Sequence, residues 1–160
     1  MPAMINPMDG MVSFQQALLD GEIDVVDGSI DTKVAVYMDR PQGQMRLTYV
    51  RLSPSKIVQA MAIFAPVEPI ERLPTFQVGY AVPPEYRGKG LAKAIVESGI
   101  AELKNGFGRN GIKTFWVEAV VGADNLVSQR VAEAVISKLG KPTTDTHSGV
   151  AALQYTRKVG

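Results

Sequence analysis

FQVGYAVPPEYRGKGLA, from Phe76 to Ala92, is the stretch of sequence that decides the fold. Its first half alternates apolar residues at positions 76, 78, 80 and 82 with smaller or polar ones, which is the period of a β-strand. Pro83 and Pro84 have no N–H to donate, so the strand is expected to end there. A glycine-rich basic turn and an amphipathic helical pattern follow directly. The stretch therefore predicts a strand, a tight turn and a helix in succession.

The turn has the features of an anion-binding site. Gly88 and Gly90 allow the backbone to turn tightly and leave amide N–H groups that no side chain covers. The start of the following helix adds unpaired N–H groups and the positive end of the helix dipole. Together these groups favour a phosphate or a pyrophosphate.

Val82 with Arg87–Ala92 closely resembles the acetyl-CoA-binding segment of the GNAT (Gcn5-related N-acetyltransferase) superfamily. That pattern is Gln or Arg, two residues, Gly, one residue, then Gly or Ala; here the first position is Glu85. Further along, Trp116–Val120 and Asn125–Ser128 look like the fifth strand and the following helix of the same fold. The resemblance covers about the last half of the chain. The residues before Phe76 add nothing specific to the family.

The resemblance implies an α/β (α+β) fold with a mixed, mostly antiparallel sheet of roughly six to seven strands and helices on both faces. A chain of 160 residues with 46% apolar content fits one domain, residues 1–160, and we expect positions 1–12 to be loosely ordered.

Strands are expected over Lys33 to Met38, Met45 to Leu52, Ile57 to Pro66, Phe76 to Val82, Lys113 to Val121 and Val150 to Lys158, with a short one between Lys141 and His147 left open. Helices are expected from Ser13 to Asp20, from Gly90 to about Asn105, and from Asp124 or Asn125 to Leu139. Ala65 to Pro74, with its prolines, is expected to be an irregular connection.

The resemblance also implies which residues hold acetyl-CoA. The backbone amides of the turn would hold the pyrophosphate, and the backbone of Ala81 and Val82 would pair with the pantetheine arm. Asn125 corresponds to the residue that hydrogen-bonds the pantetheine, with Ser128 beside it. Gly79 would mark a bulge that separates this strand from the next. The turn residues in question are Arg87, Gly88, Lys89, Gly90, Leu91 and Ala92.

Glu118 matches the acidic position that some family members use as a general base. The alternative is that Glu118 is only an outward-facing residue of its strand. No single residue stands out as the acid for the leaving thiolate. Many members have a tyrosine seven residues after the asparagine, where this chain has Ala132. Ser128, Tyr155 or a water molecule could take its place, and we interpret Tyr80 as a packed strand residue.

The amino-acid composition of the chain limits the classes of partner and site that can be expected. Seventeen basic against sixteen acidic residues give a net charge of +1, which does not indicate a nucleic-acid or membrane-surface partner. Without cysteine, disulfides, thiolate nucleophiles and cysteine zinc sites are excluded, and no metal is expected. No apolar run reaches the ~20 residues of a membrane helix, and no signal peptide is recognised, so a cytoplasmic protein is expected.

The sequence thus predicts an N-acetyltransferase that moves acetyl from acetyl-CoA directly to a primary amine of a small molecule or a protein. A CoA-binding module without catalysis, and a partner or oligomer interface on the same fold, are the alternatives. The acidic residues between Asp20 and Asp31 form either a solvated loop or a rim that attracts a cationic acceptor. Homodimerisation is left open.

Overall fold

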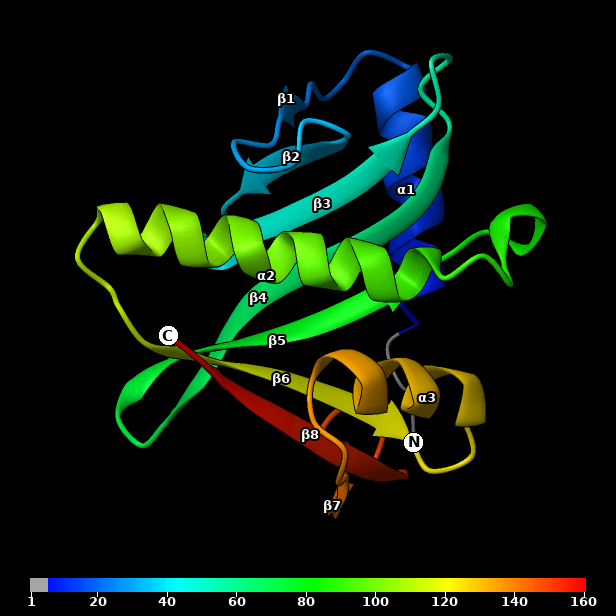
Figure 1. The fold of residues 1–160 in the computed structure, drawn as a ribbon. Helices are drawn as coiled ribbons and strands as arrows, with labels where there is room; N and C mark the ends of the chain where they lie inside the picture. Colours follow the sequence, from blue (N-terminus) through cyan, green and yellow to red (C-terminus); the bar gives the residue numbers. More distant parts are fainter. Residues whose placement is uncertain (1–5) are drawn as a thin grey trace.

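One mixed sheet carries the fold in the computed structural model, which describes residues 6–160 (Figure 1). Its eight strands lie in the order β1-β2-β3-β4-β5-β6-β8-β7. Neighbours are antiparallel except for β5 and β6, which are parallel, as expected of a strand–helix–strand crossover. In chain order the elements are α1 (Pro7–Leu19), β1 (Val26–Asp27), β2 (Val34–Asp39), β3 (Arg46–Leu52), β4 (Val58–Ile70), β5 (Leu73–Ala81), α2 (Leu91–Arg109), β6 (Phe115–Gly122), α3 (Leu126–Val135), β7 (Lys141–Thr144) and β8 (Ala151–Val159).

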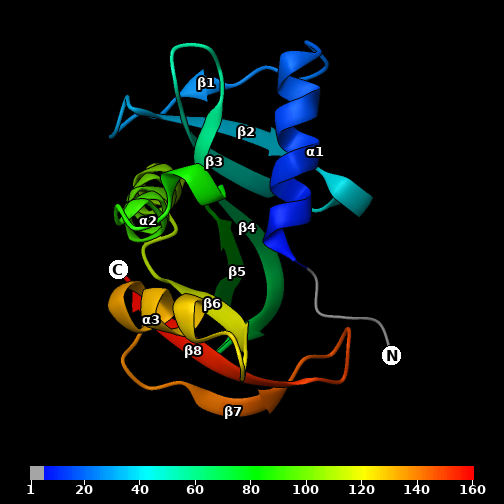
Figure 2. The ribbon, with the colours of Figure 1, turned by 90° about the vertical axis from the view of Figure 1, so that its right-hand side faces the viewer.

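The GNAT-type mixed α/β fold is confirmed, with one or two more strands than expected. Figure 2 shows α1 on one face of the sheet and α2 and α3 on the other. The larger apolar core lies between the sheet and α2 and α3, and a smaller cluster around Met11 and Met61 lies under α1. Among the described residues no helix is long and apolar enough to span a bilayer.

α1 begins earlier than the sequence indicated. Asn6 caps it by accepting a hydrogen bond from the Met8 amide at 3.0 Å, and Pro7 occupies the first turn, where a missing N–H costs nothing. The expected start at Ser13 was therefore wrong, as was loose order for residues 6–12. Residues 1–5 lie outside the described part of the chain.

The expected connection between Ala65 and Pro74 was also wrong. β4 runs on to Ile70 and meets β5 in a hairpin whose two turn residues, Glu71 and Arg72, have φ of 52° and 63°. Pro66 is tolerated in β4 because β3 pairs with β4 only as far as Phe64, which leaves that edge of the strand without a partner.

The helices α2 and α3 end differently from the prediction. α2 continues past the expected end near Asn105, through Gly106 and Gly108, to Arg109. α3 stops at Val135, and Leu139, the expected end of the helix, lies beyond it and is 83% exposed.

β5 and β6 pair over three positions only. The pairs run from Thr75↔Trp116 to Gln77↔Glu118, after which the two strands part (Figure 1). The bulge expected at Gly79 is absent. Gly79 pairs with Ile63 of β4, and the register between β4 and β5 is unbroken there. A Cβ on Gly79 would instead lie 3.2 Å from Cγ of Pro7, so the glycine makes room for the start of α1.

Glu102 joins the loop after β1 to the middle of α2. Its carboxylate is 8% exposed and accepts backbone hydrogen bonds from Ser29 (3.0 Å), Ile30 (2.6 Å) and Asp31 (2.9 Å). Three amide donors satisfy a buried charge that would otherwise be costly to desolvate. The acidic loop is therefore held against α2 at the β1 edge of the sheet.

We expect Glu102→Ala to lower the free energy of unfolding by about 2 kcal/mol, because three loop amides lose a charged acceptor. Glu97→Ala on the same helix is the control. Glu97 makes an exposed ion pair with Arg157 at 3.1 Å, so its loss should cost less than about 1 kcal/mol. Urea denaturation measures both, and equal effects would contradict this account of Glu102.

Candidate active site

The turn between β5 and α2 is open to solvent. Gly88 and Gly90 have φ of 79° and 75°, in the left-handed region, and Gly90 caps α2. The first hydrogen bond of the helix runs from the Ala94 amide to the Gly90 carbonyl at 3.1 Å, so the three amides before Ala94 lie at the free end of the helix. A Cβ placed on either glycine would meet nothing within 4 Å. This run of amides, from Gly88 to Lys93, is called the amide cradle below.

Arg87 differs from its expected role. Its backbone amide already donates to the Pro84 carbonyl at 3.3 Å, so Arg87 cannot contribute that amide to the cradle without losing this bond. Its side-chain Nε donates to the Val82 carbonyl at 2.9 Å, which occupies the acceptor expected to face the pantetheine. Lys89 places its ammonium 5.9 Å from the centre of the Tyr86 ring. The turn therefore brings two basic side chains next to the free amides.

The gap between β5 and β6 opens on the side where α2 and α3 begin (Figure 1). Asn125 caps α3 by accepting a hydrogen bond from the Ser128 amide at 3.2 Å. The Tyr80 hydroxyl, from β5, donates to the Ser128 carbonyl at 2.6 Å and so links β5 to α3. Burial raises the pKa of Tyr80 above its usual value, so the hydroxyl stays protonated at neutral pH. Sequence reasoning took Tyr80 only for a packing residue, since nothing in its neighbourhood indicates a partner on α3.

Glu118 lies where the two strands part and is partly buried. Its neighbours Val117 and Ala119 point into the core shared with α2 and α3, so Glu118 points to the opposite face, on which α1 lies. Gln77 donates to Oε1 of the carboxylate at 3.3 Å and Gln154 donates to Oε2 at 2.8 Å. The carboxylate is thus held at the start of the gap, with further lone pairs still free to accept a proton.

Tyr155 is not brought together with Glu118. It pairs with Ala119 in the β6–β8 ladder, which places it on the face of α3, and it is 2% exposed. Burial, with the charge of Glu133, raises the pKa of Tyr155. Ala132, at the position expected for a tyrosine, is fully buried. Tyr155 therefore packs in the core, on the opposite side of the sheet from the carboxylate.

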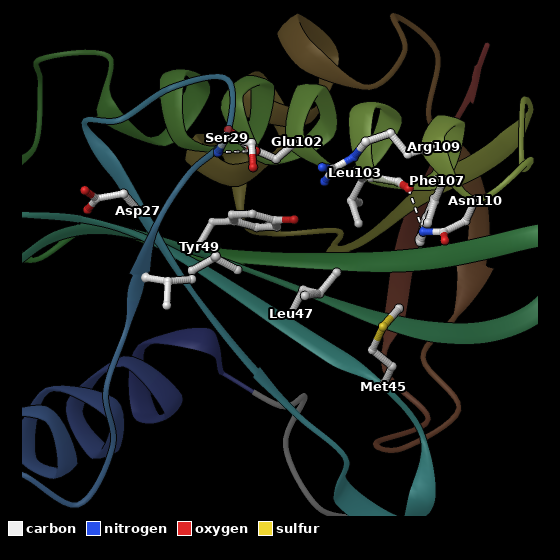
Figure 3. A pocket seen from close by; sticks show the side chains of 13 residues that line it. Asp27, Ser29, Met45, Leu47, Tyr49, Glu102, Leu103, Phe107, Arg109 and Asn110 are labelled. Atoms are coloured by element: carbon white, nitrogen blue, oxygen red, sulfur yellow. Dashed lines mark hydrogen bonds between the residues drawn. The ribbon is translucent and has the colours of Figure 1, made fainter.

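A cavity lies elsewhere, between β1, β2, β3 and the second half of α2 (Figure 3). It measures about 280 Å³ and is lined mainly by apolar side chains such as Leu47, Leu103 and Phe107. None of the residues expected at the site lines it. Among residues 6–160 no group of three acidic or histidine side chains could hold a metal ion. The splayed strands and the cradle, and not this cavity, form the candidate site.

The chain is similar in fold to several solved acetyltransferases. A GNAT-family acetyltransferase from Streptococcus pneumoniae matches over 98% of this chain and 96% of its own, with 13% identity and a TM-score of 0.53. A putative GnaT-family acetyltransferase from Bordetella pertussis is 24% identical over 69% of this chain and 64% of its own, with a TM-score of 0.50, so the chain spans less than two thirds of that relative. A chain of the NatC complex bound to Gag peptide and CoA matches over 71% of this chain and 71% of its own, with 14% identity and a TM-score of 0.54.

No curated protein matches the chain. The model of the acetyltransferase (GNAT) family, in contrast, matches residues 43–135, which include β3, β5, the cradle, β6 and α3. This match covers more than half of the chain and contains both the amide cradle and Glu118. The chain therefore belongs to the GNAT family of acetyltransferases.

Proposed function

We propose that the protein is an N-acetyltransferase that moves an acetyl group from acetyl-CoA directly to a primary amine. The observation that carries the proposal is the parting of β5 and β6 after Gln77 and Glu118, next to a row of uncovered amides at the start of α2. A gap in the sheet exposes strand backbone that a ligand with amide groups can pair with, and the amides favour a diphosphate.

The residues present fit acetyl-CoA, the co-substrate of the family. The amides from Gly88 to Ala92 and the positive end of the α2 dipole would hold its pyrophosphate. Ala81 ends the unpaired side of β5 and offers backbone groups along the gap. Asn125 uses Oδ1 to cap α3, which leaves its Nδ2 hydrogens for a ligand carbonyl.

Acetyl-CoA supplies the acetyl group as a thioester. The role of Glu118 would be to accept a proton from the acceptor amine, so that the nitrogen lone pair can attack the acetyl carbon. Because the sequence has no cysteine, a thiolate nucleophile on the protein is excluded, which agrees with direct transfer. Ser128, whose hydroxyl lies on the first turn of α3, remains a candidate for the proton that the leaving sulfur takes up.

The acceptor would approach from the face that carries α1, because the Glu118 side chain points there. Small amines and protein amines are both candidate acceptors. A screen of primary amines, including spermidine, glycinamide and short peptides with free N-termini, with released CoA as the readout, tests the activity itself. Binding of acetyl-CoA without turnover of any amine would favour the second candidate, a CoA-binding module in which the buried Ala132 marks lost catalysis.

We expect Gly90→Val to weaken CoA binding at least about tenfold, because a β-branched residue is strained at φ of 75° and relaxation would displace the cradle amides. Gly21→Val is the matched control. Gly21 has φ of 73° and equally open surroundings, but it lies in the turn after α1. Titration calorimetry with CoA compares the two variants, and equal affinities would contradict the placement of the pyrophosphate.

We expect Glu118→Gln to lower kcat by about 100-fold or more while CoA affinity changes little, because the amide keeps the shape of the side chain but accepts no proton. Steady-state kinetics with the best amine of the screen, together with calorimetry, separates the two effects. Full activity of this variant would remove Glu118 from the mechanism.

A further inference from the structure

We propose that Gln154 is a positioning residue, which fixes the direction of the Glu118 carboxylate at the start of the gap. This inference rests on the proposed function, since it assigns a partner to the residue proposed as the base. Gln154 lies on β8, 36 residues away from Glu118 in sequence, and outside the segment that matches the family model.

The contacts form a bridge across three strands. Gln77 on β5 donates to one carboxylate oxygen of Glu118 on β6, and Gln154 on β8 donates to the other. The contact from Gln154 is the shorter, at 2.8 Å against 3.3 Å, so Gln154 makes the stronger bond. With both oxygens engaged, the carboxylate is confined to one orientation.

The register of the sheet makes this arrangement follow from the fold. Glu118 is paired with Thr156, and Gln154 is paired with Val120, so Gln154 is the diagonal neighbour of Glu118 on the same face of the sheet. Leu153 and Tyr155, the neighbours of Gln154 in sequence, point to the other face of the sheet, into the core shared with α2 and α3. A shift of β8 by one residue would therefore turn Gln154 away from Glu118.

The bridge has a chemical consequence. Both donors are neutral amides, so they hold the carboxylate oxygens without supplying a proton of their own or a competing positive charge. A base held in one orientation loses less entropy when it receives a proton at a defined point. Since Gln77 pairs with Glu118 at the last position where β5 and β6 meet, the bridge also fixes the carboxylate beside the gap.

The experiment combines an activity-free measurement with kinetics. In ¹⁵N-labelled protein, the side-chain NH₂ signal of Gln154 should lie away from the positions of exposed glutamines and move toward them in Glu118→Met, which has no acceptor. In the kinetics, Gln154→Met should lower kcat about tenfold, which corresponds to one charge-assisted hydrogen bond, and leave KM for acetyl-CoA unchanged. Gln154→Glu should lower kcat further, because it places a second carboxylate beside the first.

Two further variants separate positioning from a structural role. Gln77→Met should have a smaller effect than Gln154→Met, in line with its longer contact. Gln16→Met is the control, because the side chain of Gln16 bonds only the exposed Asp20 at the end of α1, and it should keep full activity. Melting temperatures of the Gln154 variants should stay close to that of the unsubstituted protein.

The outcomes distinguish this inference from the proposed function. The positioning role of Gln154 is overturned if its NH₂ signal is unchanged in Glu118→Met, or if Gln154→Met keeps full kcat. Either result leaves the proposed role of Glu118 as the base in place. Full activity in Glu118→Gln overturns the proposed base instead, whatever Gln154 does.

Discussion

The rest of the site depends on one constraint, the parting of β5 and β6 after three paired residues. Among residues 6–160, no strand pairs with β5 beyond Gln77 or with β6 beyond Glu118 on the side that faces the gap. Backbone N–H and C=O groups need partners, and a strand edge without one is a template for another extended chain. An amide-containing arm such as pantetheine can supply that partner. The same gap that interrupts the sheet is therefore where we propose that the cofactor binds.

Three parts of the chain meet around this gap for different physical reasons. The cradle is there because β5 ends at two prolines and α2 begins two glycines later. α3 is there because the crossover from β6 returns to the same face as α2. Glu118 is there because strand alternation turns it away from the core that Val117 and Ala119 enter. The cofactor side and the proposed acceptor side thus lie on opposite faces of the sheet.

Local sequence patterns predicted well those helices and strands whose ends are marked by a proline or a glycine. The strand before Pro83 and the helix after Gly90 are examples, because prolines and a left-handed glycine act within a few residues. The prediction failed where tertiary packing overrides the signal. Glycines 106 and 108 lie inside α2, where Phe107 between them packs against Phe76 and Phe115. Prolines 66 and 69 lie inside β4, where β3 no longer pairs with the strand. Asn6 and Pro7 do form a cap signal, which the sequence reading overlooked.

The sequence by itself determined the family pattern, the position of the cradle and the presence of an acidic residue in the strand after α2, because each depends on neighbours within one element. Only the tertiary structure decided what those residues touch. It placed Tyr155 in the core behind Glu118, joined Tyr80 to Ser128, and brought Gln77 and Gln154 to the two oxygens of Glu118. Such contacts join residues 36 or more positions apart, and they follow from the register between strands, which no local pattern specifies.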